Sequence, residues 1–243
     1  MITFGRGIKV NIGGQGVYKL SPQFYFSNWE NFGDKHNSGF LSCIENSINK
    51  KVVLDIGAHI GLYSLPLSSR ISPEGKIYAF EPSEINRHFL KKNLELNKIQ
   101  NVDVLPFLVG SKDVQNVEFY EDAKEVNPMG GIILSKYMND NVVITNKQMV
   151  SLDTYCQDND IQPELIKIDV EGAEIDLLLG AKNTLLKYRP TIFLSLHPQH
   201  IEETNHSLSD LRRYLEEVNF KCLTIDRKSN DAFQEKECFL IPK

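Results

Sequence analysis

Cysteines are few in this sequence, and none of them forms a pair. The four are Cys43, Cys156, Cys222 and Cys238. No C-x-x-C motif and no cysteine–histidine spacing typical of a zinc site occurs. Isolated cysteines in a chain of this size are typical of a reducing compartment. We therefore expect a cytoplasmic protein.

Long apolar runs and an excess of basic side chains are also missing. No run of about 20 apolar residues occurs, so we expect no membrane span, and residues 1–7 lack the apolar core of a signal peptide. The 27 basic and 32 acidic side chains give a net charge of −5. Nucleic-acid binding usually requires a basic surface, so we expect no nucleic-acid partner.

From residue 51 onward, apolar segments typical of buried strands alternate with helical segments. We predict strands at 52–56, 76–80, 102–107, 117–120, 142–144, 165–169 and 191–196, helices at 62–69, 85–97, 175–187 and 208–218, and a closing strand pair at 222–225 and 238–241. This alternation predicts an α/β fold with right-handed βαβ units and a mainly parallel sheet. The closing strand–turn–strand predicts an antiparallel strand at its end.

Residues 1–50 lack this alternation and form a separate N-terminal extension. Their glycine cluster at 13–16 is not followed by Gly-Lys-Ser/Thr, so it is no P-loop and predicts a hairpin turn. Residues 41–48 predict one helix. Five aromatic residues lie in this extension: Phe24, Tyr25, Phe26, Trp29 and Phe32. They either pack on the edge of the main domain, 51–243, or form a lid over a substrate pocket.

The most informative segment connects the first strand of the main domain to its first helix, at residues 54–61. Glycine there lets the backbone approach a ligand, and the helix that follows directs its free N–H groups at an anion. Gly57 and Gly61 form a Gly-x-x-x-Gly pattern after Asp55, not the Gly-x-Gly-x-x-Gly of dinucleotide enzymes. The pattern fits a cofactor with a carboxylate. Bracing or capping the loop is the alternative role for Asp55.

An acidic residue, Glu81, ends the second strand and is followed by Pro82. At this place a carboxylate can accept hydrogen bonds from both ribose hydroxyls. Its distance in sequence from Asp55 is close to the roughly 20 residues of one βαβ step. The glycine loop and Glu81 together predict a nucleoside-type cofactor. Gly110, at the end of the third strand, would admit the flat adenine ring.

Several segments, in order, resemble the FkbM family of methyltransferases. They are residues 53–64, 79–82, 93–97, 151–153 and 166–174, the last with the pattern Lys-x-Asp-x-Glu-Gly-Ala-Glu. The resemblance implies a Rossmann-like seven-stranded methyltransferase fold with helices on both faces of the sheet. It also implies S-adenosylmethionine as donor, S-adenosylhomocysteine as product, and a hydroxyl acceptor on a sugar or natural product.

The glycine loop and the family resemblance together give a set of candidate cofactor-binding residues: Asp55, Gly57, Ala58, His59, Gly61, Glu81, Pro82, Gly110 and Asp169. Two positions depart from the family pattern. His59 stands where asparagine is more frequent, and Ser195 stands two residues before His197, where an acidic residue is usual. The second departure concerns the acceptor side.

Methyl transfer from a sulfonium is an in-line displacement, so the protein mainly aligns acceptor, methyl and sulfur. A hydroxyl acceptor must also lose a proton, which calls for a base or a metal. The catalytic candidates are Asp169 and Glu171, which follow the fourth buried strand, and His197, which follows the fifth. Helix capping and a structural histidine are the alternatives. A divalent cation held by all three is possible but not favoured, and we expect Lys167 to pair with an acidic neighbour.

Three other functions compete with O-methylation of a sugar, glycan or natural product. An N-methyltransferase would predict Asn-Pro-Pro-Tyr after the fourth strand, and this motif is absent. A nicotinamide oxidoreductase would require the Gly-x-Gly-x-x-Gly fingerprint, and this sequence lacks its middle glycine. A non-catalytic module that binds a nucleoside cofactor stays open, because the acidic residue before His197 is missing. The sequence does not indicate the acceptor or the oligomeric state.

Overall fold

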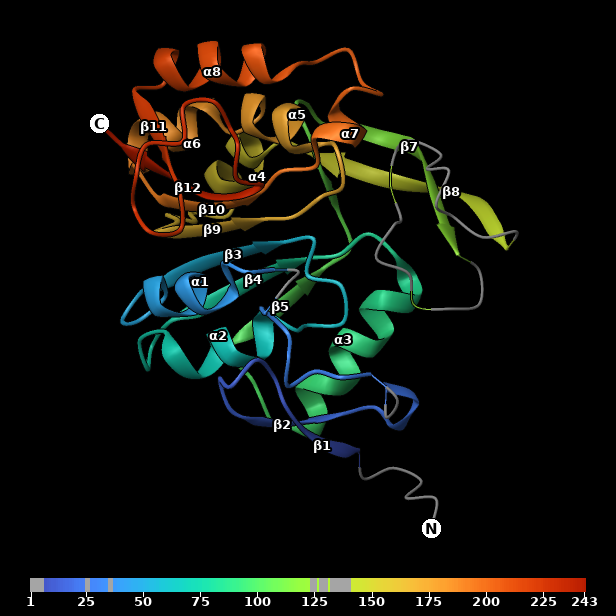
Figure 1. Cartoon of the computed structure of the whole chain (residues 1–243). Helices are drawn as coiled ribbons and strands as arrows, with labels where there is room; N and C mark the ends of the chain where they lie inside the picture. Colours follow the sequence, from blue (N-terminus) through green and yellow to red (C-terminus); the bar gives the residue numbers. More distant parts are fainter. Residues whose placement is uncertain (1–6, 25–26, 35–36, 123–125, 127–130, 132–140) are drawn as a thin grey trace.

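The chain has a central sheet of seven strands, in the order β11-β12-β10-β9-β3-β4-β5 (Figure 1). The computed structural model describes residues 7–24, 27–34, 37–122, 126, 131 and 141–243. Tyr25 and Phe26 therefore lie outside the described residues. The strands are β3 (Val52–Ile56), β4 (Lys76–Phe80), β5 (Val102–Leu105), β9 (Leu165–Ile168), β10 (Thr191–Ser195), β11 (Phe220–Leu223) and β12 (Glu237–Pro242).

The predicted sheet is confirmed in both its parallel and its antiparallel part. β3 pairs in parallel with β4 and β9, β4 with β5, and β9 with β10. β12 runs antiparallel to β10 and to β11, and lies between them. Four of the five residues of β3 are buried, as expected for a parallel strand with both faces covered.

Helices cover both faces of this sheet, and each face has its own hydrophobic cluster. One cluster includes α4 (Leu152–Asp158), α5 (Glu174–Leu179), α6 (Lys182–Tyr188), α7 (Pro198–Ile201) and α8 (Leu208–Glu217). The other includes α1 (Phe40–Asn46), α2 (Ser64–Arg70) and α3 (Glu84–Leu96). In Figure 1 the two groups lie on opposite sides of the strands.

The helices differ from the sequence prediction in three places: the helix expected at 175–187, and α4 and α7, which were not expected. The helix expected at 175–187 is divided into α5 and α6 around Gly180. A Cβ at this position would lie 2.1 Å from the carbonyl oxygen of Gly110. The close contact between these two segments of the chain therefore requires glycine. α4 was not predicted, although Ser151 caps it by accepting a hydrogen bond from the backbone N–H of Thr154.

The N-terminal extension, which includes α1, packs on the face of the sheet that α2 and α3 cover. Its strands β1 (Ile8–Asn11) and β2 (Val17–Leu20) pair antiparallel, so the predicted hairpin turn is confirmed. The one-turn 3₁₀ helix η1 (Pro22–Phe24) follows. Asn97, just after α3, accepts from the backbone N–H of Lys19 and donates to its carbonyl oxygen. The extension thus shares a hydrophobic cluster with the main domain.

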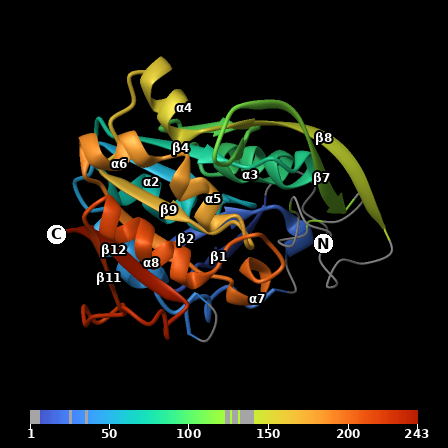
Figure 2. The same cartoon turned by 90° about the horizontal axis from the view of Figure 1, so that it is seen from above.

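A second, three-stranded sheet has the order β6-β8-β7. It consists of β6 (Leu108–Val109), β7 (Val114–Asp122) and β8 (Val142–Val150). The strands predicted at 117–120 and 142–144 are thus parts of longer ones. β7 and β8 form a curved ribbon that extends away from the central sheet (Figures 1 and 2). Within the described residues, no helix is long and apolar enough to span a membrane.

Candidate functional site

A cavity of about 880 Å³ lies at the carboxyl ends of the parallel strands. Its wall is built by the segments that follow β3, β4, β5, β9 and β10, together with part of the N-terminal extension. Open α/β sheets bind their ligands in this place, because the loops at the carboxyl ends of the strands surround a common crevice. The cavity is therefore the candidate site.

The structure brings most of the predicted site residues to this wall. The lining includes Gly57, Ala58, His59, Glu81, Pro82, Asp169, Glu171 and His197. Asp55, Gly61 and Gly110 are not part of it. Gly61 and Gly110 instead allow close packing, because a Cβ would lie 2.6 Å from Leu90 Cδ1 in the first case and 2.4 Å from Met149 Sδ in the second. Phe107, Leu108 and Val109 line the cavity beside Gly110.

Gly57 fixes the shape of the loop after β3. Its φ is +77°, and a Cβ would lie 1.9 Å from the carbonyl oxygen of Asp169. Only glycine fits both conditions. The ends of β3 and β9 can therefore approach each other, which places the glycine loop beside Asp169.

Asp55 and Lys167 form a buried ion pair behind this loop. Lys167 Nζ lies 3.2 Å from Asp55 Oδ1 and donates a hydrogen bond to the Gly57 carbonyl at 2.8 Å. Asp55 Oδ2 accepts from Ser64 Oγ at the start of α2. Burial alone would lower the pKa of Lys167, but the charges of Asp55 and Asp169 outweigh it and raise the pKa. The expected pairing of Lys167 is confirmed, and in this structure Asp55 braces the loop.

Glu81 connects the glycine loop to the loop after β4. Its Oε2 accepts from the backbone N–H of His59 at 2.8 Å, and its Oε1 accepts from the backbone N–H of Ser83 at 2.9 Å. Asn86 Nδ2 donates to Oε1 at 3.4 Å. A carboxylate accepts about four hydrogen bonds, so Glu81 keeps capacity for a ligand in the cavity.

His59 contributes a polar atom to the wall. Its Nε2 is buried and has no hydrogen-bond partner among the described residues. Burial lowers the pKa of His59 to about 4, with the charge of Lys167 acting in the same direction. The ring is therefore neutral at physiological pH, and Nε2 can make one hydrogen bond to a ligand.

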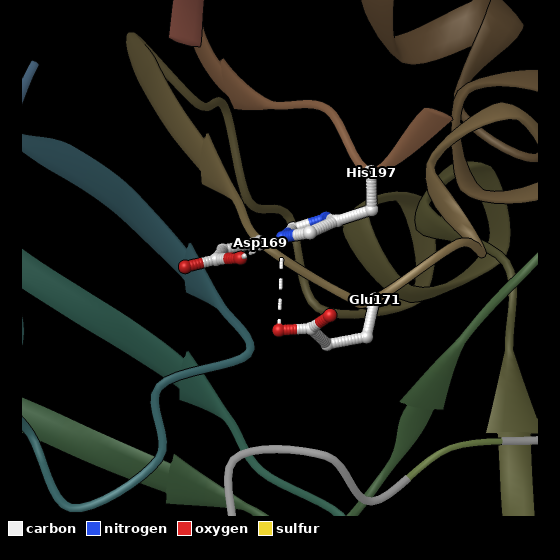
Figure 3. A group of neighbouring side chains, drawn as sticks. All are labelled: Asp169, Glu171 and His197. Atoms are coloured by element: carbon white, nitrogen blue, oxygen red, sulfur yellow. Dashed lines mark ion pairs between the residues drawn. The ribbon is translucent and has the colours of Figure 1, made fainter. Parts of the chain in front are cut away.

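Asp169, Glu171 and His197 converge where the loops after β9 and β10 meet (Figure 3). Nε2 of His197 lies 3.6 Å from Asp169 Oδ1 and 3.6 Å from Glu171 Oε1. One ligand atom from each of the three side chains lies within 4.8 Å of the others. One nitrogen and two carboxylate oxygens in this arrangement can hold either a proton or a divalent cation.

Two further side chains hold this cluster in place. Nδ1 of His197 donates to Oε1 of Glu174 at 2.7 Å, and Glu174 is fully buried. The same oxygen accepts from the backbone N–H of Gly172. His200 Nδ1 lies 3.1 Å from Glu171 Oε2. Sequence reasoning did not give Glu174 a role in the site, because its contact with His197 depends on how the loops after β9 and β10 meet.

The charges of this cluster shift two pKa values. Burial would lower the pKa of His197, but the hydrogen bond to Glu174 and the charges of Glu171 and Asp169 raise it to about 9. Burial raises the pKa of Glu171 to about 7, partly opposed by His197. At neutral pH the imidazolium form of His197 predominates, stabilised by three carboxyl groups.

The N-terminal extension supplies an apolar part of the wall. Phe24, Trp29 and Phe32 line the cavity, with Phe24 and Phe32 each edge-to-face against Trp29. Three of the five aromatic residues that the sequence predicted either as edge packing or as a lid thus line the cavity. Glu237, the first residue of β12, also lines it. No signal in the sequence indicated Glu237, because only the pairing of β12 with β10 brings it to the site.

Comparison with known proteins gives one family. The family model described as "Methyltransferase FkbM domain" matches residues 55–222. The chain is 29% identical over 208 residues to the AMB antimetabolite synthetase AmbE of Pseudomonas aeruginosa, covering 70% of this chain and 10% of that protein. It is 36% identical over 99 residues to the tRNA(Phe) (4-demethylwyosine(37)-C(7)) aminocarboxypropyltransferase of Methanocaldococcus jannaschii, covering 41% of this chain and 36% of that protein. The chain thus spans about a third or less of these curated relatives.

Solved structures of similar fold include methyltransferases with low sequence identity. The methyltransferase FkbM of Methylobacillus flagellatus gives a TM-score of 0.48 at 18% identity, covering 79% of this chain and 44% of that one. The precorrin-6y C5,15-methyltransferase of Geobacter metallireducens gives a TM-score of 0.47 at 13% identity, covering 92% of each chain.

Proposed function

The chain belongs to the FkbM family of S-adenosylmethionine-dependent methyltransferases, and we propose that it methylates a hydroxyl oxygen. The acceptor is a small molecule or a glycan: a sugar or another natural product with hydroxyl groups. The observation that carries this proposal is the position of His197, whose Nε2 faces the cavity between Asp169 and Glu171 while Nδ1 is fixed by Glu174.

The residues at the glycine-loop end of the cavity fit S-adenosylmethionine, which supplies an activated methyl group when bound. Glu81 keeps acceptor capacity for the ribose hydroxyls, and the orphaned Nε2 of His59 is available to a polar group of the donor. Gly57, Ala58 and Pro82 bring backbone close to the donor. The glycine at position 57 lets this loop lie against the Asp169 carbonyl, because a Cβ there would lie 1.9 Å from its oxygen.

The three candidate catalytic residues have distinct roles in this proposal. His197 Nε2 would accept the proton of the acceptor hydroxyl. The bound donor would supply the methyl group, and its carbon–sulfur bond would break to release S-adenosylhomocysteine. Asp169 and Glu171 flank Nε2 and stabilise the imidazolium that forms, while Glu174 on Nδ1 keeps the ring oriented. This is how a carboxylate–histidine pair activates a hydroxyl nucleophile. No metal is required for the step.

The aromatic residues of the N-terminal extension form the outer part of the acceptor pocket in this proposal. Phe24, Trp29 and Phe32 come from residues 1–50, whereas the donor and catalytic residues come from residues 51–243. The extension therefore acts as a wall or lid over the acceptor. Four free, buried cysteines support a reducing location, the cytoplasm.

The proposal is tested by product analysis with S-adenosylmethionine that carries a ¹³C-labelled methyl group. The purified chain is incubated with hydroxyl compounds (methyl glycosides, alcohols and phenols) and with amines as the comparison set. We expect a new O-methyl signal in the carbon NMR spectrum of a hydroxyl compound. A label that appears only on amines, or donor binding without any transfer, would overturn the proposal.

A further inference from the structure

Glu237 lies on the acceptor side of the cavity, beside the strand that leads to His197. It is the first residue of β12 and pairs directly with Ser195 of β10. Residues directly opposite in an antiparallel pair place their side chains on the same face of the sheet. Both residues line the cavity, with 8% and 9% of their surface exposed. The Glu237 carboxylate thus lines the cavity next to Ser195, two residues before His197.

The two oxygens of Glu237 have different surroundings. Oε2 accepts from Ser38 Oγ and from the backbone N–H of Gly39, both at 2.8 Å. Oε1 is buried and has no hydrogen-bond partner among the described residues. Buried polar atoms almost always have a partner, supplied by protein, water or ligand. A nearly buried carboxylate oxygen in the cavity wall therefore calls for a hydrogen-bond donor that the described residues do not supply.

The charges around this oxygen restrict what the donor can be. Burial raises the pKa of Glu237, the bonds from Gly39 and Ser38 oppose this, and the charge of Asp169 adds to the increase. An anionic group of the acceptor would face the carboxylates of both Glu237 and Asp169. A neutral hydroxyl meets no such repulsion and can donate directly to Oε1.

We propose that Glu237 recognises the acceptor by accepting, at Oε1, a hydrogen bond from a second hydroxyl beside the one that is methylated. The inference rests on the proposed function and makes it more specific. The acceptor then carries at least two neighbouring hydroxyl groups, as a sugar ring does, and an isolated alcohol or phenol binds poorly.

Glu237→Gln separates recognition from the anchoring of residues 38 and 39. Two donors, Ser38 Oγ–H and the Gly39 N–H, require an acceptor at the Oε2 position, so the amide oxygen of glutamine remains there. The amide NH₂ then faces the cavity and replaces an acceptor by a donor. Ser38→Ala is the matched control, because it weakens the anchoring and leaves Oε1 unchanged.

The experiment measures initial rates of methyl transfer from S-adenosylmethionine to methyl glycosides, to their deoxy derivatives and to cyclohexanol. We expect wild type to prefer a glycoside, and Glu237→Gln to lower its kcat/KM at least about tenfold, mainly through KM. Ser38→Ala should stay within about threefold. On the deoxy derivative that lacks the second hydroxyl, the kcat/KM of wild type should be lower by a similar factor. Glu237→Gln should then have little further effect on kcat/KM.

Calorimetry with S-adenosylmethionine and thermal unfolding accompany the rates, and both should be unchanged in the Glu237→Gln variant. Equal losses in Glu237→Gln and Ser38→Ala would show that Glu237 only anchors the extension. Equal rates on cyclohexanol and glycosides would also overturn the inference, while O-methylation itself would stand. Donor binding without methylation of any hydroxyl compound would instead reject the proposed function.

Discussion

His197 donates a hydrogen bond from Nδ1 to Oε1 of Glu174 over 2.7 Å, and Glu174 has no exposed surface. This contact fixes the orientation of the imidazole and places the proton of the neutral ring on Nδ1. Nε2 then faces the cavity as an acceptor. The same arrangement of a buried carboxylate and a histidine orients the general base in serine hydrolases.

The rate should increase with pH up to about 9. The pKa of His197 is raised to about 9, so the neutral form that can accept a proton is the minor form at pH 7. Below that pKa, each increase of one pH unit raises the neutral fraction about tenfold. We expect kcat/KM, measured from pH 6 to 10, to follow this fraction and level off near the pKa. A profile that is flat from pH 6 to 9 would contradict the assignment of His197 as base.

Glu174→Gln should lower the rate and move the pH profile. Loss of the charge on Nδ1 lowers the pKa of His197, so the rising part of the profile shifts to lower pH. The weaker base should lower the plateau of kcat at least about tenfold, with KM little changed. Asp176→Asn, on the same helix α5 and half-exposed, is the control and should leave both quantities unchanged. A lower rate without a shifted profile would indicate a purely structural role for Glu174.

Glu81→Ala should weaken the binding of S-adenosylmethionine. The substitution removes the acceptor proposed for the ribose and the bond to the His59 N–H. Loss of hydrogen bonds to a charged group costs roughly 1.5–3 kcal/mol, so calorimetry should show the Kd increasing at least about tenfold. Glu84→Ala, which removes an exposed carboxylate at the start of α3, is the control. Unchanged donor affinity in Glu81→Ala would remove Glu81 from the donor site.

Removal of divalent cations should not affect the rate. Asp169, Glu171 and His197 have the donor atoms of a cation site, but the proposed step needs only the proton affinity of His197. We expect equal initial rates after treatment with EDTA and after addition of magnesium or manganese. A rate that falls with EDTA and returns with a metal would show that the three side chains bind a cation.

Lys167→Met should strongly destabilise the fold. It leaves the carboxylate of Asp55 buried without its cation, and breaking a buried ion pair from one side costs about 3–5 kcal/mol. Lys76→Met is the control, because its ion pair with Asp103 is exposed and contributes about 1 kcal/mol or less. Urea unfolding, followed by circular dichroism, measures the free energy of unfolding of both variants. Similar decreases in the free energy of unfolding of the two variants would show that the buried ion pair contributes no more stability than the exposed one.

The parts of the fold that depend on local pattern could be predicted from the sequence. β3 and β4 have the predicted bounds, because each is a mainly apolar, largely buried run that ends in a loop. The division of the helix at Gly180 could not be predicted, because it depends on the contact with Gly110, far away in the sequence.

The same distinction applies to the site. The glycine loop, Glu81, Asp169 and His197 follow buried strands, and the parallel sheet brings all strand ends of this kind together. Glu174 and Glu237 acquire their roles only through contacts between segments that are distant in sequence. A single sequence contains no local signal for such contacts.

The most direct test of His197 as the base for O-methylation compares wild type with His197→Gln, using S-adenosylmethionine with a ¹³C-labelled methyl group and a hydroxyl acceptor. His88→Gln, on α3, serves as the control for histidine substitution. We expect an O-methyl product with wild type and the control, and a rate lower by about 10²–10⁴-fold with His197→Gln, while donor affinity measured by calorimetry stays the same. Full activity of His197→Gln, or a product methylated on nitrogen, would contradict it.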